Sequence, residues 1–382
     1  MELKGQKICL NCVMDETDED ITFDENGICD HCNLFFHRDQ NTWDNCLENK
    51  YIEGFRSFVE NLKKTKNGPY DCIIGLSGGC DSSYMLHKLV TEFGLKPLCL
   101  HVDAGWNTKA AVSNINNMVS KLGLDLIVDV IDWDEMRELQ LAFLRAGVSH
   151  QDTPQDHAFF ATLHKYAERY KIRTIFSGGN ISTEAVIVPI NWMYYTSDVW
   201  QLSDIEKRFC KIPLIKFPRS SVLHRKVISP YLKRTKVFHP LNSFRYIKKE
   251  GESFLSSNYN FETFDEKHYE SVFTKYYEAI YLPKKFGYDT RKVTYSSLIL
   301  TGQMTRDLAL KKLSSSALSL DDEIRLEKYV ADKLHISLST LRDMVFGENK
   351  SYNDYRNQAY LYNFGAAITK RIPGMNASGA KR

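Results

Sequence analysis

Long apolar stretches are missing from this sequence, and so is any segment that resembles a signal peptide. Its longest uninterrupted apolar stretches, such as residues 185–190, fall far short of the roughly 20 residues that a membrane span needs. Polar residues and cysteines stand where a signal peptide has its apolar core. The composition, 43% apolar and 26% charged residues, is that of an average soluble protein rather than of a disordered chain or a fibre. We therefore expect a cytoplasmic protein without membrane insertion.

The nine cysteines are an odd number in a chain without an export signal, which favours a reducing compartment. Four of them form two close pairs, Cys9 with Cys12 and Cys29 with Cys32, and 16 residues separate the pairs. Two pairs at this distance can bring four thiolates onto one tetrahedral zinc ion. Residues 1–45 are therefore predicted to form a zinc-ribbon module with structural Zn²⁺.

Acidic residues are absent from one long segment. Residues 207–249 hold 13 Lys and Arg and no Asp or Glu, whereas residues 1–53 hold 13 acidic and only 4 basic residues. A basic block of this length favours an anionic partner such as phosphate, carboxylate, nucleic acid or an acidic domain. A solvated face, or a surface on which the acidic N-terminus docks, explains it equally well. The zinc module itself would repel nucleic acid phosphates.

Strand-like and helical segments alternate in the middle of the chain. The short apolar runs that suit buried strands are residues 71–76, 96–102, 124–131 and 174–176, and the helical stripes between them are residues 82–93, 108–122 and 155–170. This alternation predicts an α/β fold with a parallel, doubly wound sheet covered on both faces. Ligands bind at the carboxyl ends of such strands, so the loops after the strands are the candidate sites.

The first of these loops is rich in glycine and serine. It reads Ser77-Gly78-Gly79-Cys80-Asp81-Ser82-Ser83, between a predicted strand and a predicted helix. Glycines let the backbone approach an anion, and the free N–H groups at a helix start attract negative charge. Asp81 would repel phosphate, so its presence indicates a Mg²⁺ ion between it and the phosphates. The loop lacks the lysine spacing of the P-loops that cleave a γ-phosphate.

This loop resembles that of the PP-loop ATP pyrophosphatases, the adenine-nucleotide α-hydrolase superfamily that includes GMP synthetase and NAD synthetase. Two later loops fit the same pattern, and the resemblance implies that all three contact ATP. The implied ATP-binding residues are Ser77, Gly78, Gly79, Asp81, Ser82, Ser83, His101, Val102, Asp103, Gly178, Gly179 and Asn180.

Motifs in the C-terminal half resemble a narrower family. They are His268 to Thr274, Leu282 to Gly287, Arg291, Ser296 to Leu298 and Gly302 to Arg306. With the N-terminal cysteines, they resemble the N-acetyl sugar amidotransferases of bacterial surface-polysaccharide (lipopolysaccharide O-antigen) biosynthesis. That family adenylates an acetamido group on a nucleotide-linked sugar, and ammonia displaces AMP to give an acetamidino sugar. The ammonia comes from a separate glutaminase resembling HisH, working with a HisF-like protein.

The resemblance also implies site residues. We expect Ser77 and Asp81, the latter with Mg²⁺, to hold the departing pyrophosphate. Lys285, Arg291 and Arg306 are candidates for binding pyrophosphate or the phosphates of the sugar nucleotide, and Thr274 for binding substrate. His268 and Glu270 could orient the substrate or move protons. For the charged residues, an ordinary surface or helix position is about as plausible from sequence alone.

Four regions follow from these patterns. They are a zinc-ribbon module at 1–45, a helical connector at 46–68, a PP-loop ATP pyrophosphatase domain at 69–230, and a mainly helical substrate or partner region at 231–382.

A glutaminase nucleophile is also missing from the sequence. No cysteine follows the first Met, and none lies in a Gly-x-Cys-x-Gly elbow. The chain is therefore not expected to release ammonia from glutamine by itself, which independently predicts a partner.

The main alternative is a tRNA-modifying enzyme with the same loop, either a thiolase or a lysidine-type ligase. The basic block could then follow a phosphate backbone. Against it, the zinc module is acidic, and Cys99 and Cys210 are isolated rather than grouped as catalytic cysteines. Cys80 within the loop is not expected to be essential. A third possibility is a degenerate nucleotide-binding scaffold, which the intact Ser77, Asp81 and Ser82 disfavour.

Overall fold

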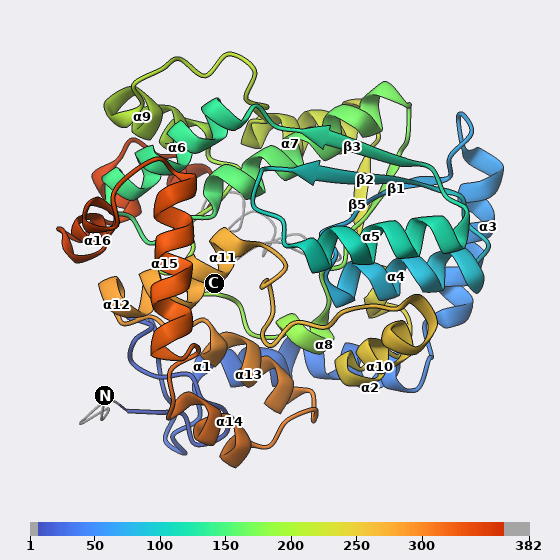
Figure 1. Ribbon diagram of the computed structural model, residues 1–382. Coiled ribbons are helices and arrows are strands. Elements are labelled where there is room, and N and C mark those ends of the chain that lie inside the picture. The colour runs from blue at the N-terminus through green and yellow to red at the C-terminus, as the bar shows by residue number, and fades with distance from the viewer. Residues whose placement is uncertain (1–6, 363–382) are drawn as a thin grey trace.

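The computed structural model describes residues 7–362, and a five-stranded sheet lies at its centre (Figure 1). In sheet order the strands are β3 (Leu126–Val130), β2 (Pro97–Asp103), β1 (Cys72–Gly75), β4 (Thr174–Phe176) and β5 (Lys236–Phe238). All four neighbouring pairs are parallel. The α/β class and the parallel sheet predicted from the alternation are confirmed.

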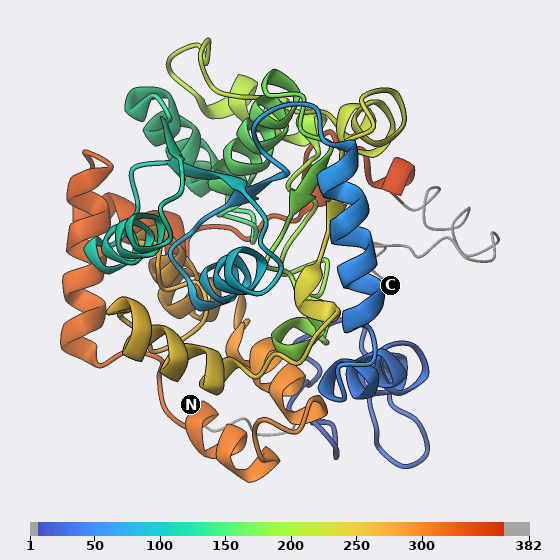
Figure 2. The same cartoon turned by 90° about the vertical axis from the view of Figure 1, so that its right-hand side faces the viewer.

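Helices cover both faces of the sheet because the side chains of each strand alternate between two apolar cores. Cys72 and Ile74 of β1 pack in one core with α3 (Ile52–Thr65), α4 (Cys80–Thr91), α5 (Lys109–Leu122) and α10 (Lys248–Tyr259). Ile73 points into the other core, with α6 (Trp133–Ala146), α7 (Thr153–Arg169) and α9 (Val199–Phe209). The sheet is therefore doubly wound, as predicted, and Figure 2 shows it between its two helical layers.

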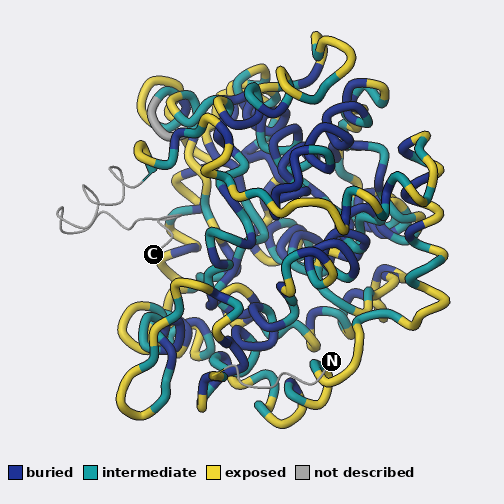
Figure 3. The backbone as a smooth tube through the Cα atoms, turned by 90° about the vertical axis from the view of Figure 1, so that its left-hand side faces the viewer, coloured by how far each residue is buried: buried dark blue, intermediate teal, exposed yellow. Residues whose placement is uncertain are grey.

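A third apolar core joins the N-terminal cysteine module to the C-terminal helices. The short elements of the module and its connection are α1 (Asp30–Leu34), a π-helical turn at Phe35–Asp39 and α2 (Gln40–Leu47). The remaining helices are α8 (Ile181–Glu184), α11 (Val272–Tyr276), α12 (Leu282–Phe286), α13 (Arg291–Leu300), α14 (Arg306–Leu313), α15 (Leu320–Lys333) and α16 (Leu338–Phe346). The buried backbone of these cores fills the middle of the molecule in Figure 3.

Two elements differ from the sequence-based expectations. Helix α6 was not anticipated, although its stripe of apolar residues, including Met136, Leu139 and Phe143, is completely buried. Strand β5 lies after residue 230, where the nucleotide-binding domain was expected to end, because it pairs with β4 from Thr174↔Lys236 onward. The division of the chain into four regions stays a prediction.

Within residues 7–362, no helix is both long enough and apolar enough to cross a bilayer.

Candidate functional site

The glycine loop after β1 is shaped by contacts that exclude larger residues. Gly78 has a φ of +84°, and a β-carbon there would lie 2.5 Å from the carbonyl oxygen of Ala111. A β-carbon on Gly79 would lie 2.8 Å from Oε1 of Glu270. Helix α4 begins immediately afterwards, with Gly79 as its N-cap and no side chain capping its first N–H groups. The loop therefore presents a helix start to an anion, as predicted.

Asp81 lies in the first turn of α4 and is held by groups from three distant segments. The hydroxyl of Tyr246 donates to its Oδ1 at 2.5 Å, and the hydroxyl of Thr183 donates to its Oδ2 at 3.3 Å. The ammonium of Lys267 lies 3.2 Å from Oδ2. Burial alone would raise the pKa of Asp81, but the charge of Lys267 and the hydrogen bond from Tyr246 outweigh burial and lower it. The carboxylate is therefore ionised, as a magnesium ligand must be.

Lys267 is the site residue that the sequence reasoning missed. Its ammonium lies 2.6 Å from Oε1 of Glu184 and donates to the hydroxyl of Thr183 at 2.9 Å, as well as pairing with Asp81. Burial opposes its charge, but Glu184 and Asp81 together raise its pKa. The only signal in the sequence was its position directly before the His268 motif.

The end of β2 forms a second wall of the site. The Nδ1–H of His101 donates to the carbonyl of Leu76 at 2.9 Å, directly before the glycine loop. The side-chain amide of Asn107 donates to Nε2 of His101 and to Oδ1 of Asp103. These hydrogen bonds fix the tautomer of the His101 ring and the conformation of the loop that follows β2.

The end of β4 closes against the first turn of α4. A β-carbon on Gly178 would lie 3.1 Å from the backbone nitrogen of Ser82, and one on Gly179 would lie 2.9 Å from Nδ1 of His239. Asn180 caps α8 by accepting the N–H of Thr183 at 2.9 Å. The glycine loop and the loop after β4 therefore meet at the carboxyl edge of the sheet, as the predicted fold requires.

The segment that precedes α11 also reaches this edge. The backbone carbonyl of Glu270 accepts the N–H of Thr108 at 2.9 Å, and Asn107 forms an isolated antiparallel bridge with Ser271. These contacts bring the carboxylate of Glu270 beside Gly79. Glu270, one of the C-terminal residues predicted from the family resemblance, therefore lies beside the glycine loop.

His268 belongs to a group of titratable residues beside this segment. Its Nδ1 lies 3.0 Å from Oε1 of the buried Glu278. Burial would lower the pKa of His268, but Glu278 outweighs burial and raises it to about 9. Burial and the charge of Asp156 raise the pKa of Asp152 to about 8, and a hydrogen bond from Thr274 opposes this shift. At neutral pH the group therefore contains a protonated histidine and a largely protonated aspartic acid.

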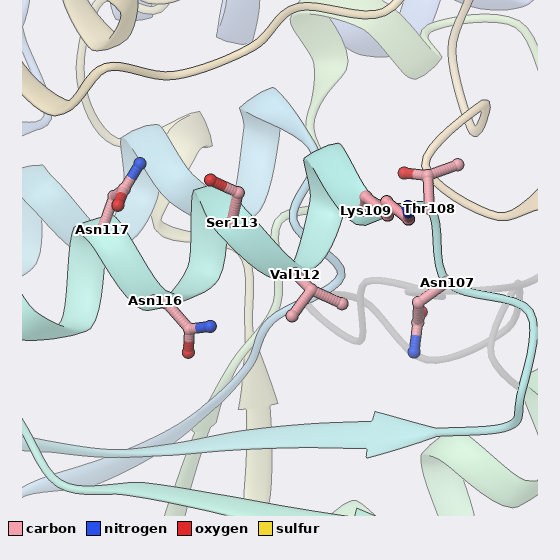
Figure 4. A pocket seen from close by; sticks show the side chains of 7 residues that line it. All are labelled: Asn107, Thr108, Lys109, Val112, Ser113, Asn116 and Asn117. Atoms are coloured by element: carbon pink, nitrogen blue, oxygen red, sulfur yellow. The ribbon is translucent and has the colours of Figure 1, made fainter.

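An open hollow of about 540 Å³ lies along α5 (Figure 4). Its lining residues are mainly hydroxyl and amide side chains: Asn107, Thr108, Lys109, Val112, Ser113, Asn116 and Asn117. Thr108 joins the hollow to the site, because its N–H is bonded to Glu270. A surface of this chemistry suits a ligand rich in hydroxyl groups.

The donor atoms of three other predicted residues are occupied within the protein. Lys285 donates to the carbonyls of the last turn of α16 and the residue after it, at 2.9–3.2 Å. Arg291 forms a bidentate pair with Asp289 and donates to two further carbonyls. Arg306 donates to the carbonyls of Cys9 and Cys12. These contacts stabilise the C-terminal region, and phosphate binding by the three residues stays a prediction.

The four predicted metal ligands do come together. The Sγ atoms of Cys9, Cys12, Cys29 and Cys32 all lie within 4.8 Å of one another and are fully buried. Neighbouring Sγ atoms are 3.6 to 3.8 Å apart, close to the roughly 3.8 Å that four sulfurs at about 2.3 Å from a tetrahedral zinc ion would have. Backbone N–H groups of Asn11, Cys12 and Cys29 also point at the Cys9 sulfur, as they do around thiolates. The four sulfur donors and the distances between them therefore fit a zinc ion.

The cysteine module docks on the C-terminal helices. Lys292 of α13 forms a buried pair with Asp15 at 2.5 Å, and Trp192 donates to the carbonyl of Thr17 at 3.0 Å. Lys292 and Arg306 attach the cysteine module to α13 and α14. The basic block at 207–249 contacts the acidic N-terminal region near its end, where the Cys46 thiol donates to the carbonyl of Asn242 and the N–H of Arg245 donates to Asn49.

Two solved structures show weak similarity to the chain. An NH3-dependent NAD synthetase from Campylobacter jejuni has 16% identity and a TM-score of 0.29, and the match covers 55% of this chain and 93% of that chain. The U34-tRNA thiolase NcsA from Methanococcus maripaludis, with its 4Fe-4S cluster, has 12% identity and a TM-score of 0.30, over 67% and 80% of the two chains.

Two curated relatives match short stretches. An uncharacterised protein of Methanocaldococcus jannaschii is 38% identical over 78 residues, which are 20% of this chain. A glutamine-hydrolysing GMP synthase of Chlamydia muridarum is 32% identical over 82 residues, or 22% of this chain. The chain spans 28% and 15% of the lengths of these two relatives.

A family match covers the C-terminal part of the chain. Residues 270–369 match the family described as "LPS biosynthesis protein WbpG-like, C-terminal domain". The matched segment begins at Glu270, the residue that lies beside the glycine loop, and it includes α11 to α16. This confirms the resemblance to surface-polysaccharide enzymes that the C-terminal motifs indicated. The C-terminal region of this chain is therefore similar to the C-terminal domain of WbpG-like lipopolysaccharide biosynthesis proteins.

Proposed function

We propose that this protein is the synthetase half of an ATP-dependent sugar amidotransferase for lipopolysaccharide biosynthesis. One observation carries the proposal: the first residue of the WbpG-like region, Glu270, lies against Gly79 of the glycine loop. Lys267, three residues earlier, pairs with Asp81 in the same loop. A region with a lipopolysaccharide-biosynthesis signature therefore shares one site with a loop suited to nucleotide phosphates.

The proposed reaction has two steps. The acetamido oxygen of a nucleotide-linked sugar attacks the α-phosphorus of ATP, the bond to the bridging oxygen breaks, and pyrophosphate leaves. Ammonia then adds to the acetamido carbon, loses a proton, and AMP departs with the original oxygen. The product is an acetamidino sugar in which NH replaces that oxygen.

The protein contributes positioning and charge to these steps. The uncapped N–H groups at the start of α4 bind the phosphates, and Lys267 neutralises the negative charge that develops on the departing pyrophosphate. Magnesium arriving with ATP would supply further positive charge at Asp81. Glu270 and His268 border the substrate and hold protons near the acetamido group.

The hydroxyl and amide side chains along α5 suit the sugar. Ser113 and Asn116 line the hollow beside Thr108, whose backbone is bonded to Glu270. A sugar bound there would direct its acetamido group toward the glycine loop. A diacetamido uronic acid linked to uridine diphosphate is the proposed substrate class, and a nine-carbon acidic sugar is its rival.

Ammonia is proposed to come from a glutaminase resembling HisH together with a HisF-like protein. The adenylated acetamido group, an imidoyl adenylate, would hydrolyse in bulk water. Direct delivery of ammonia from a partner protein would keep water away from this intermediate. The partner proposal fails if the purified chain alone uses glutamine as efficiently as ammonium.

The deciding experiment supplies Mg-ATP and ammonium chloride with either a nucleotide-linked diacetamido sugar or bulk tRNA. Release of AMP and pyrophosphate that depends on the sugar is expected, with mass spectrometry detecting NH in place of an amide oxygen. Release that depends on tRNA instead would refute the proposal.

The alternative, a tRNA-modifying enzyme, finds less support in the residues. The Cys80 thiol lies 3.5 Å from the hydroxyl of Tyr246, and burial together with the charge of Asp81 raises its pKa. A thiol held protonated in this way is a poor nucleophile for sulfur transfer.

A further inference from the structure

The proposed reaction does not use the exposed cations of the basic block at residues 207–249. Its exposed part begins in the last two residues of a π-helical element, η2 (His224–Leu232), and ends on the edge strand β5. The side chains of Tyr231 and Leu232 are 62% and 74% exposed, and Lys233, Arg234 and Lys236 beside them are exposed as well. We call these five residues the basic–apolar surface. The element lies at the outer margin of the molecule in Figure 2.

Further cations extend this surface along one edge of the sheet. The N–H of Lys236 donates to the carbonyl of Arg173 at 2.8 Å, which joins the start of β5 to the start of β4. Arg173, Lys171 and Lys66 line one small hollow, so the end of α3 adds its charge to the same region. All of these cations lie at the amino ends of the strands, opposite the edge that carries the glycine loop.

Two nearby carboxylates compensate only part of this charge, because they pair with Lys233 and Lys66 and leave Lys171, Arg173, Arg234 and Lys236. Glu168 of α7 pairs with His224 at 2.9 Å and lies 3.9 Å from Lys233. Asp71 is buried, pairs with Lys66 at 3.0 Å and accepts the N–H of Lys96. The acidic N-terminal module is attached to α13 and α14 instead, so it does not cover the region.

We propose that the basic–apolar surface binds a lipid bilayer with anionic headgroups. Lysine and arginine attract such a membrane electrostatically, and an exposed leucine and tyrosine beside them gain free energy by entering the headgroup region. An RNA backbone would use the cations but would leave Leu232 in water. Bound in this way, the chain keeps the glycine loop on the side away from the bilayer.

The test uses the full-length protein and sedimentation with vesicles. One vesicle is pure phosphatidylcholine, and the other contains about a third phosphatidylglycerol. The triple variant Leu232→Ser, Lys233→Gln, Lys236→Gln removes one exposed apolar side chain and two cations, so it is expected to bind the anionic vesicles at least ~10-fold more weakly. The matched control is Leu308→Ser, Lys311→Gln, Lys328→Gln, which removes one exposed leucine and two exposed lysines from α14 and α15.

The expected result is binding to the anionic vesicles only, loss in the triple variant, and retention in the control. A Leu232→Trp variant should also show a blue-shifted emission when the anionic vesicles are added, because the ring leaves water. Absence of binding by the wild type, or equal loss in both triple variants, would overturn the proposal. Binding to bulk tRNA that depends on Lys233 and Lys236, without vesicle binding, would assign the surface to nucleic acid instead.

Discussion

Lys267 and Asp81, far apart in sequence, form an ion pair of 3.2 Å at the start of α4. Glu184 shares the same ammonium at 2.6 Å, so one lysine compensates two carboxylates. Where phosphates enter the site, this lysine is the cation already in position to meet them. The pair thus links the glycine loop to the segment directly before the WbpG-like match.

Replacing Lys267 by Met should lower the rate of AMP formation by roughly 100-fold or more, the usual effect of removing one charge-stabilising group. Lys267→Arg should restore part of the rate. The pKa of Asp81 should rise in the Met variant, because the charge that lowers it is lost. Lys311→Met on exposed α14 is the control, and equal rates in both Met variants would exclude a role for Lys267.

Gly78→Ala should abolish nucleotide turnover and destabilise the protein by about 1–3 kcal/mol, the range for a strained backbone position. Its positive φ and the 2.5 Å approach to Ala111 leave no room for a methyl group. The control is Gly123→Ala, which has a positive φ of +62° but open space around it. Chemical denaturation and ATP binding measure the two effects, and similar losses in both variants would show that steric contact is unimportant.

Cys9→Ser should weaken zinc binding by the four-cysteine cluster and reduce the yield of folded protein, because structural zinc sites contribute directly to folding. Cys46→Ser is the matched control, since Cys46 is equally buried but lies outside the four-cysteine cluster. Mass spectrometry of the metal content of each purified variant distinguishes Cys9→Ser from Cys46→Ser. Arg306→Gln should make the metal easier to remove with a chelator, because its guanidinium holds the carbonyls of Cys9 and Cys12.

Asp152→Asn should reduce the pH dependence of stability. The pKa of Asp152 is raised from 3.8 to about 8, so the folded protein holds a proton that the unfolded chain releases at intermediate pH. The wild type should therefore lose stability as pH rises from about 4 to 8. Urea unfolding at pH 5 and pH 8 measures the loss, which should be smaller in the variant. An unchanged pH dependence would contradict the assignment.

Cys80→Ser should retain most of the activity, within about threefold of wild type if the thiol only packs beside Tyr246. AMP release with the sugar substrate is the measurement. Complete loss of activity would favour a thiol-dependent chemistry and the tRNA-modifying alternative.

Local sequence patterns determined much of the structure of this protein. The two cysteine pairs converge on one point, as their spacing in the sequence predicts. The glycine loop lies between a strand and a helix, as its composition predicts, and β4 has the predicted bounds. These features depend mainly on the conformational preferences of residues that are close together in the sequence.

Only the tertiary structure decided which charged residues form the site. Tyr246 and Lys267 reach Asp81 across long separations, and the position of Lys267 directly before the His268 motif does not indicate which carboxylate it pairs with. Lys285 and Arg306 carry the same charge as Lys267, yet they bind backbone carbonyls elsewhere. Strand β5 is three residues long and forms only because β4 offers it hydrogen bonds. A cation takes its role from the partners that folding brings to it, and those partners lie in distant parts of the chain.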